Sequence, residues 1–261
     1  MRELPIAWTT DLAVREHSGS TVDDRGDHVI VRTPENPTYH WGNCLLVTDT
    51  DTRDEAERWI GVFDEAFPAA TWKAIGLPAM PRVPSAWTDR GLELELDDVL
   101  TTRVLPRQTP LVAPYSVRSL EADDWEQLVA AAMADNARTG EWPPHSHEPF
   151  VRARARADLA LSERGLASFF GAFSGETLAA SLGIVLCGTT ARYRNVGTDA
   201  AHRRRGLASH LLGVAARWAG ERGCDRWVIV TESTNPAGRV YRSVGFQLDV
   251  PTVQAYRRPG Y

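Results

Sequence analysis

A run of polar, basic and small residues between positions 195 and 209 has the composition of an anion-binding loop. It reads Asn-Val-Gly-Thr-Asp-Ala-Ala-His-Arg-Arg-Arg-Gly-Leu-Ala-Ser. If a helix follows it, the first turn offers backbone N–H groups without intrahelical partners and a positive dipole end, which together can hold a diphosphate. Gly206 allows close approach, Ala208 keeps the first turn small, and the arginines at 203–205 add positive charge.

Hydrophobic periodicity predicts the elements that must position this loop. A strand over 191–198 precedes it, and a helix with Leu207, Leu211, Ala215 and Trp218 on one face follows and stops near Gly220. The remaining elements predicted after residue 114 are a strand over 115–120, helices over 123–134 and 150–161, a hairpin of strands 167–173 and 178–187, a strand over 227–231 and a short helix after Pro236 that ends near Gly245. This order describes an α/β (α+β) domain with a mixed sheet flanked by helices.

Two ordered motifs resemble the signatures of one family. Arg203, Gly206 and Ala208 fit the pattern Arg/Gln-x-x-Gly-x-Gly/Ala, and about thirty residues later Asn-Pro-Ala-Gly-Arg-Val-Tyr-Arg-Ser-Val-Gly-Phe ends at Phe246. Both resemble the GNAT superfamily of acyl-CoA N-acyltransferases, over roughly residues 115–261. The resemblance implies a mostly antiparallel twisted sheet and acetyl-CoA as the acyl donor. It also implies a site for the cofactor at Val196, Gly197, Thr198, Arg203, Arg204, Arg205, Gly206, Leu207, Ala208, Ser209 and Asn235.

The resemblance also implies how acyl transfer would proceed. In the family, the strand before the loop splays from its neighbour and pairs with the pantetheine arm, and a backbone N–H there faces the thioester oxygen. Val196 and Thr198 are the candidates for that N–H. The phenol of Tyr241 would protonate the departing thiolate, and a hydrogen bond that matures late in the reaction suffices. The competing interpretation of Tyr241 is a packed side chain whose hydroxyl bonds to backbone.

Other residues carry open alternatives. Glu232 is a candidate base for the attacking amine, or else a solvated carboxylate. Asn235 caps a helix, bonds the pantetheine, or does both, and Thr234 could fill the latter role. Arg204 stands where glycine is common, and it can serve if its φ is negative. Trp142 is followed in the sequence by Pro143 and Pro144, and these residues could shape an acceptor pocket. His145, His147 and Glu148 fall between two predicted helices, and no metal site is expected from them.

The first half predicts a fainter version of the same arrangement. Strands over 28–33 and 44–49 lead into a helical stripe from Ala56 to Phe67, but the loop between them is acidic and lacks glycine. We therefore expect a degenerate GNAT-like domain over residues 1–106 that binds no CoA, followed by a catalytic domain over 107–261. Prolines at 106, 110 and 114 mark the boundary.

Composition narrows the possible partners. The formal net charge is −5 and no long basic tail is present, so nucleic acid is not an expected partner. No run approaches the ~20 apolar residues that a membrane helix needs, so no membrane is expected either. The three cysteines lack metal-ligand spacing and are expected to be small buried apolar residues. Their number and spacing suit a cytoplasmic protein. The protein is expected to be a monomer or a homodimer.

The function expected from these features is acetyl transfer from acetyl-CoA to a primary amine of a small molecule or peptide, within a ternary complex. Two rival functions are a non-catalytic acyl-CoA-binding sensor or assembly module, and a dinucleotide-binding enzyme. The sequence lacks the G-x-G-x-x-G pattern of the second.

Overall fold

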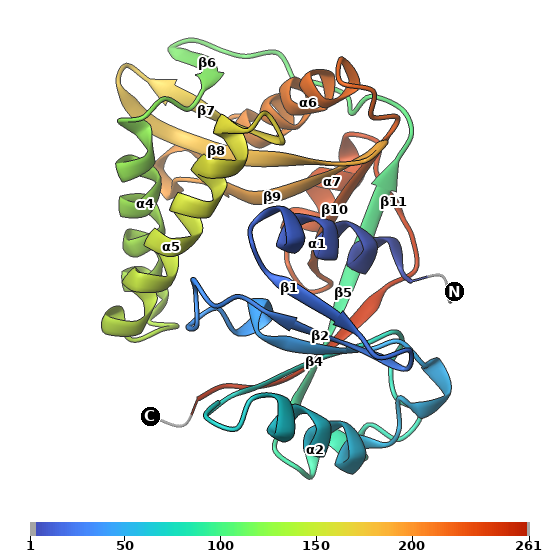
Figure 1. Ribbon diagram of the computed structural model, residues 1–261. Helices are drawn as coiled ribbons and strands as arrows, with labels where there is room; N and C mark the ends of the chain where they lie inside the picture. The colour runs from blue at the N-terminus through green and yellow to red at the C-terminus, as the bar shows by residue number, and fades with distance from the viewer. Residues whose placement is uncertain (1–3, 260–261) are drawn as a thin grey trace. The chain divides into compact units, whose positions relative to one another are not determined.

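The computed structural model describes residues 4–259 and divides into two compact units (Figure 1). Unit 1 comprises the chain up to Val99, Val230–Gly238 and the chain from Leu248 on; unit 2 comprises Leu100–Ile229 and Arg239–Gln247. Both units are discontinuous in sequence, since β5 (Glu93–Thr102), β10 (Arg226–Glu232) and α7 (Ala237–Ser243) each begin in one unit and end in the other. The domain boundary between residues 106 and 107 therefore stays a prediction.

Unit 2 is built on a mixed sheet in the strand order β10-β9-β8-β7-β6. All neighbouring pairs are antiparallel except β9 and β10, which are parallel. The strands are β6 (Tyr115–Ser119), β7 (Ala167–Ser174), β8 (Thr177–Cys187) and β9 (Thr190–Thr198), with β10 as above. The predicted mixed, mostly antiparallel sheet is confirmed, and the hairpin turns at Gly175, whose φ is +61°.

Helices cover both faces of this sheet. They are α4 (Asp124–Thr139), α5 (Pro144–Glu163) and α6 (Leu207–Gly220), with a short 3-10 turn, η3 (Ala200–His202), before α6. Consecutive side chains of β9 reach opposite layers: the Tyr193 hydroxyl donates to Leu212 O of α6 at 2.6 Å, while Arg194 pairs with Asp158 of α5 at 3.1 Å. The helices α4 and α5 thus lie side by side on one face and α6 on the other (Figure 1).

The connection between α4 and α5 is shorter than the sequence predicted. Pro144 begins α5, and Pro at the first helical position fits because its missing N–H has no partner there. His145, His147 and Glu148 therefore lie in the first turns of a helix and not in a joining segment. Asn136 closes the turn, because its side-chain oxygen accepts from Trp142 N at 2.9 Å and its amide donates to Trp142 O at 2.8 Å.

Unit 1 repeats the plan with a different strand arrangement, β1-β2-β3-β4-β12-β5, in which only β3 and β4 are parallel among the registered pairs of the described residues. Its strands are β1 (Thr21–Asp24), β2 (His28–Arg32), β3 (Cys44–Val47), β4 (Lys73–Leu77), β12 (Thr252–Arg257) and the short β11 (Gln247–Leu248), which pairs with β5. Its helices are α1 (Ile6–His17), α2 (Ala56–Ala66) and α3 (Ser85–Thr88), with 3-10 turns η1 (His40–Gly42) and η2 (Thr50–Thr52). The two strands and the helical stripe predicted for the first half are confirmed as β2, β3 and α2. The other elements of unit 1, namely α1, α3, β1, β4, β5 and β12, were not predicted.

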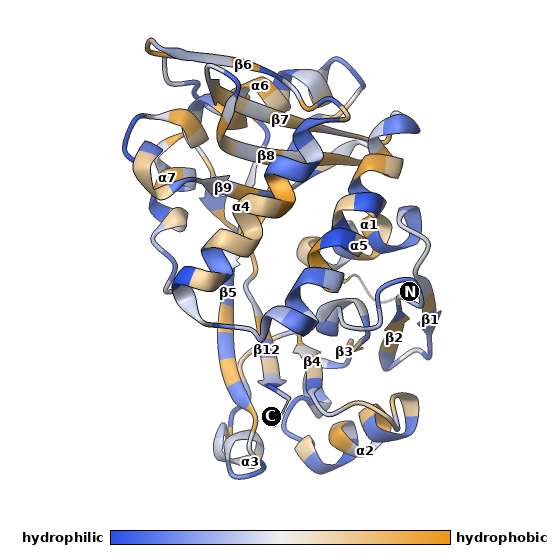
Figure 2. Ribbon diagram, turned by 90° about the vertical axis from the view of Figure 1, so that its left-hand side faces the viewer, coloured by the Kyte–Doolittle hydropathy of each residue, from blue (hydrophilic) through white to orange (hydrophobic). Residues whose placement is uncertain are grey.

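Each unit has its own apolar core. In unit 1, Trp59 and Phe63 of α2 pack inward with Ile75 of β4, and the orange and blue sides of α2 show its amphipathic character (Figure 2). In unit 2, Phe169 and Leu211 are fully buried among the strands and helices. Cys44 and Cys224 are buried free thiols, as expected of small apolar residues, whereas Cys187 is half-buried. Within residues 4–259, every helix is too short or too polar to cross a membrane.

Candidate functional site

The loop before α6 has an unusual backbone. Arg204 has a φ of +61° and Gly206 a φ of +77°, so two left-handed residues flank Arg205. The negative φ that we expected a cofactor role of Arg204 to require is therefore not found. Backbones that alternate in this way turn successive N–H groups toward one concavity, which suits an anion. A left-handed conformation costs a non-glycine residue about 1–2 kcal/mol.

The first turn of α6 offers its N–H groups to a ligand. The first intrahelical bond runs from His210 N to Gly206 O, and the cap residue Gly206 supplies no side-chain acceptor. Among the described residues, no hydrogen bond is found for the N–H groups of Leu207, Ala208 and Ser209. No acidic residue lies in this turn, so the positive end of the helix dipole is not offset locally.

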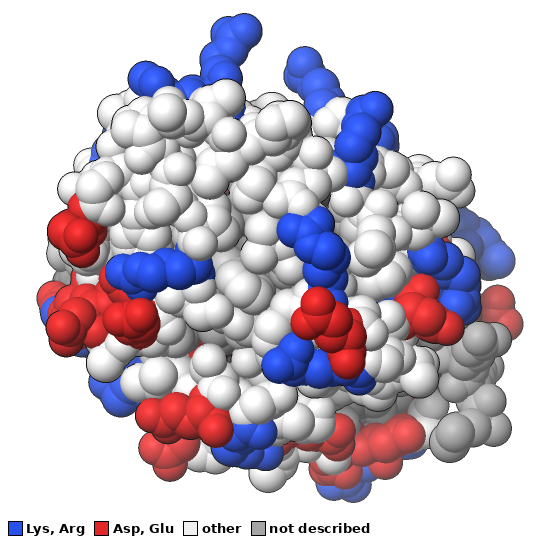
Figure 3. Space-filling model, turned by 90° about the horizontal axis from the view of Figure 1, so that it is seen from above, with Lys and Arg blue, Asp and Glu red and all other residues white. Residues whose placement is uncertain are grey.

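The three arginines before this turn are all exposed, but they are held differently. Arg203 Nε donates to Thr198 O at 3.2 Å, and the Arg205 guanidinium lies 6.0 Å from the centre of the Tyr115 ring. Tyr115 is itself fixed, because its hydroxyl lies 2.8 Å from His202 Nδ1. On the face seen from above, basic side chains stand apart and form no continuous patch (Figure 3).

Strand β9 loses its parallel neighbour before it reaches this loop. The ladder to β10 pairs Thr190–Arg192 with Arg226–Val228, and within the described residues no register pair extends it. On its other side, β9 stays paired to β8 as far as Thr198, through a bulge near Asn195, whose φ is +53°. One edge of β9 from Tyr193 to Thr198 is therefore open for an extended ligand.

The direction of the open N–H groups follows from one hydrogen bond. Asp199 N donates to Ala179 O of the β8 side at 2.9 Å. Since N–H groups alternate between the two sides of a strand, Gly197 N–H also faces β8, whereas those of Val196 and Thr198 face away. The Thr198 carbonyl faces the same outer side, and its oxygen accepts the hydrogen bond from Arg203 Nε. Val196 thus presents an N–H on the open edge next to the bulge.

Tyr241 lies in α7 with a phenol that is buried but not used by the protein. Its side chain is 5% exposed, and among residues 4–259 its hydroxyl has no hydrogen bond. Burial raises the pKa of Tyr241 to about 12. Tyr193 is the contrasting case, since its buried hydroxyl bonds to Leu212 O. The packing that the competing interpretation predicts for Tyr241 is therefore present, but a bond from its hydroxyl to backbone is not found among residues 4–259.

Two other predicted residues belong to unit 1. Asn235 Oδ1 accepts from Ala237 N at 3.0 Å, so Asn235 caps α7. Glu232 ends β10 as an exposed carboxylate. Thr234 lies between them in a turn. The roles of Glu232 as base and of Asn235 toward the cofactor stay predictions.

Two groups of residues were missed from the sequence. The chain at Arg107–Thr109 lies along α6: Gln108 Nε2 is 2.9 Å from His210 Nε2, and His210 Nδ1 is 2.7 Å from Thr109 O. Arg107 N also donates to Val244 O at 2.8 Å, so this segment contacts both α6 and the chain after α7. The second is Asp158, which sits on the apolar stripe of α5 with Val151, Ala155 and Leu161. A lone carboxylate on such a stripe is a signal that the sequence did carry.

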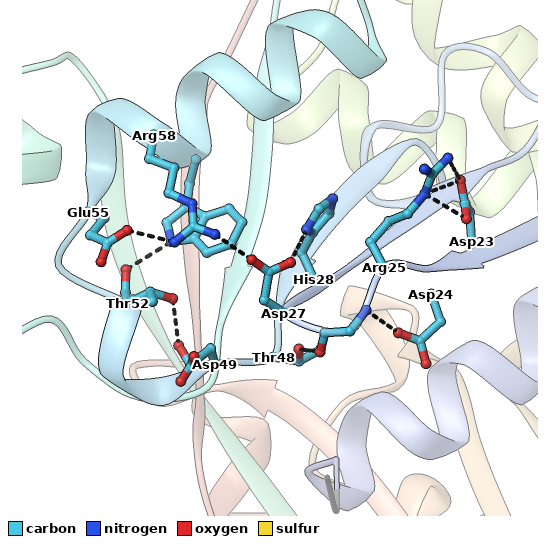
Figure 4. Close-up of polar contacts among 12 residues, drawn as sticks. Asp23, Asp24, Arg25, Asp27, His28, Thr48, Asp49, Thr52, Glu55 and Arg58 are labelled. Atoms are coloured by element: carbon cyan, nitrogen blue, oxygen red, sulfur yellow. Dashed lines mark hydrogen bonds and ion pairs between the residues drawn. The ribbon is translucent and has the colours of Figure 1, made fainter. Parts of the chain in front are cut away.

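The corresponding loop of unit 1 has the opposite charge (Figure 4). Glu55 is the cap residue of α2 and Glu57 lies in its first turn, so the helix start is acidic. Arg58 is neutralised, because it donates to Glu55 Oε2 at 2.8 Å and to Asp27. A hollow beside it is lined by Asp54, Glu55, Ala56, Glu57, Arg58, Ala86 and Arg90. Such a start of a helix disfavours an anion.

No group of three metal-ligating side chains comes together within residues 4–259. His147 packs against Phe150 at a ring distance of 5.9 Å, and burial and then Arg154 lower its pKa. Glu148 instead accepts from Arg152 at 2.8 Å.

A comparison with known families gives a match over one part of the chain. The model of the acetyltransferase (GNAT) family matches residues 119–246, a stretch that contains β9, the loop, α6 and Tyr241. Residues 119–246 belong to the GNAT acetyltransferase family. No curated protein matches the chain.

Solved structures extend the likeness in fold beyond the GNAT match. A GCN5-related N-acetyltransferase from Kribbella flavida is 15% identical to this chain and has a TM-score of 0.68. The likeness covers 99% of this chain and 98% of the Kribbella chain. A functionally unknown conserved protein from Staphylococcus epidermidis is 11% identical with a TM-score of 0.71, over 91% of this chain and 93% of its own. At these identities the likeness concerns the fold alone, and it spans both units.

Proposed function

We propose that this protein is an N-acetyltransferase that moves the acetyl group of acetyl-CoA to a primary amine by direct attack in a ternary complex. The observation that carries the proposal is the open edge of β9 from Tyr193 to Thr198, which leads directly into the unblocked start of α6. A pantetheine arm can pair with the first, and a pyrophosphate can bind at the second.

The cofactor would be held mainly by backbone. The N–H groups of Leu207, Ala208 and Ser209 would donate to the pyrophosphate, and the guanidinium groups of Arg203, Arg204 and Arg205 add charge around it. Val196, Gly197 and Thr198 would align the pantetheine arm, with Asn235 as a further contact. Gly206 allows the phosphates to approach the chain closely.

In the reaction, the amine nitrogen attacks the thioester carbonyl carbon and the carbonyl oxygen gains negative charge. The Val196 N–H on the open edge is our choice for stabilising that oxygen. The C–S bond then breaks and the sulfur departs as a thiolate. The amine loses its proton to water or to Glu232.

Tyr241 would act on the leaving sulfur as a hydrogen-bond donor. With a pKa of about 12, its phenol is a much weaker acid than a thiol of pKa ~8.5, so complete proton transfer is unfavourable. A hydroxyl without a protein partner, at the end of a largely buried side chain, is well suited to donate a hydrogen bond that forms as the thiolate appears. This feature favours catalysis over the alternative of a non-catalytic acyl-CoA sensor.

The experiment is an acceptor screen that scores free CoA with acetyl-CoA as donor, over polyamines, amino acids, aminoglycosides and peptides with free N-termini. We expect saturable release that depends on one class of amine. Saturable acetyl-CoA binding without release for any amine would favour the sensor instead.

A further inference from the structure

A buried carboxylate on α5 reaches the bulge of β9. Asp158 is 1% exposed, and its two oxygens have different partners. Oδ2 accepts from Asn195 Nδ2 at 2.8 Å. Oδ1 lies 3.1 Å from Arg194 Nη1 in an ion pair, in which the geometry is not that of a hydrogen bond. The Arg194 side chain is itself only 16% exposed, so the ion pair is largely removed from water. All three residues belong to unit 2.

The geometry of this contact depends on the bulge. In a regular strand, consecutive side chains point to opposite faces, so Arg194 and Asn195 could not both reach one carboxylate. Here the register with β8 shifts between Ser181 and Gly183, and Asn195 takes a left-handed φ of +53°. The extra residue turns the Asn195 side chain to the face of α5. One carboxylate therefore contacts Arg194, which still pairs with Gly183, and Asn195, the first residue of the bulge.

We propose that Asp158 is a positioning residue for acetyl transfer, which holds the bulge of β9 so that the Val196 N–H faces the thioester oxygen. The proposal rests on the proposed function. We assign Asp158 no contact with substrate or cofactor, because α5 lies on the opposite face from α6 and the carboxylate already pairs with Asn195 and Arg194. Its effect passes through Asn195, the residue directly before Val196.

The alternative role, a general base for the amine, predicts different behaviour. A base must accept a proton from the amine and return it to water, which requires access. A positioning residue must instead act through Asn195, so removing the Asn195 amide should reproduce its loss. Asn195→Gly is the informative change, because glycine keeps the positive φ without strain and removes the side chain that bonds to Asp158.

The test compares Asp158→Asn and Asn195→Gly with a matched control, Asp124→Asn, in the full chain. Asp124 is a second buried aspartate of unit 2, 4% exposed and bound to Arg118 at 3.0 Å, but it lies at the start of α4 away from β9. We would measure kcat and KM for acetyl-CoA, and hydrogen exchange of the peptide covering residues 193–198. The exchange readout requires no substrate.

We expect Asp158→Asn and Asn195→Gly each to speed exchange over 193–198 and to lower kcat about 10-fold or more, with KM for acetyl-CoA within about threefold. Asp124→Asn should change neither. Unchanged exchange in Asp158→Asn, or wild-type kcat in Asn195→Gly beside a large loss in Asp158→Asn, would overturn the proposal. If exchange quickens but the wild-type protein acetylates no amine, the proposed function fails while the hold on the bulge stands.

Discussion

The side chain of Thr109 lies directly against Gly206 at the start of α6. A Cβ placed on Gly206 would come within 2.8 Å of Thr109 Cγ2, closer than carbon atoms tolerate. Gly206 also has a φ of +77°. Two separate physical reasons therefore keep this position a glycine: its backbone conformation and the segment that crosses it.

These two reasons can be separated by stability measurements. Gly206→Ala should lower the free energy of unfolding by about 1–3 kcal/mol, from left-handed strain plus the displacement of Thr109. Gly188→Ala is the matched control, since Gly188 has a φ of +67° in the same unit with open space around it. Adding Thr109→Ser should return Gly206→Ala to the level of Gly188→Ala in urea unfolding. Equal losses for both single variants would contradict the close contact.

Arg204 offers a stabilising change within the proposed cofactor loop. Because its φ is +61°, Arg204→Gly should relieve strain that Arg204→Ala retains, and should exceed it in stability by about 1 kcal/mol. Both variants lose the same guanidinium, so they should weaken CoA binding equally. Thermal unfolding and calorimetric titration measure the two effects. A glycine variant no more stable than the alanine variant would mean that this backbone is not left-handed in solution.

Tyr241 can be tested against another buried tyrosine. Tyr241→Phe should lower kcat at least about 10-fold at saturating acetyl-CoA, because the departing thiolate loses its hydrogen-bond donor. Tyr193→Phe should instead cost about 1 kcal/mol of stability through its lost bond to Leu212 and leave kcat near the wild-type value. Steady-state kinetics and urea unfolding of both variants check this. Unchanged turnover in Tyr241→Phe would exclude the donor role.

The raised pKa of Tyr241 also predicts the alkaline limb of the rate profile. The phenol stays neutral in the folded protein up to about pH 12, so its ionisation should not lower kcat between pH 8 and 10. Stability should fall as the pH rises through ~10, because the unfolded state loses this proton first. A fall in kcat near pH 10 that disappears in Tyr241→Phe would contradict the burial of this hydroxyl.

In unit 1, His40 predicts a loss of stability in acid. Its ring stacks on Trp72 at 4.4 Å, Nδ1 is 2.6 Å from the Tyr256 hydroxyl, and burial lowers its pKa to about 4. The unfolded chain binds this proton near pH ~6.5, so stability should decline from there toward pH 4. His40→Gln can still bond to Tyr256 but cannot titrate. In urea unfolding, the slope of its free energy of unfolding against pH should be smaller than that of the wild type over this range, by up to the equivalent of one bound proton. An identical pH slope in both proteins would contradict the lowered pKa.

Periodicity and motif spacing were sufficient to predict most of the elements of unit 2, but only β2, β3 and α2 of unit 1. The mixed sheet, the hairpin at Gly175 and the helix after Gly206 could be predicted, because the hydrophobic periodicity of strands and helices depends on residues that are close in the sequence. The start of α5 was misplaced because a Pro-Pro pair suggested a break, whereas Pro144 begins the helix.

The remaining features depend on residues far apart in the chain. The bulge at Asn195 is fixed by Asp158, and the start of α6 is covered by Thr109, neither of which local propensity can reveal. The left-handed Arg204 was missed for a related reason: the fold around the loop overrides the preference of the residue itself.

We propose that each chain has one CoA site and that this site lies at the start of α6. Calorimetric titration of CoA into the full chain tests it, with Arg203→Glu plus Arg205→Glu in unit 2 compared with Arg58→Glu plus Arg90→Glu in unit 1. We predict one site per chain, at least about 10-fold weaker binding in the first double variant, and wild-type affinity in the second. Two sites per chain, or loss of binding only with the second pair of substitutions, would rule out a single CoA site at the start of α6.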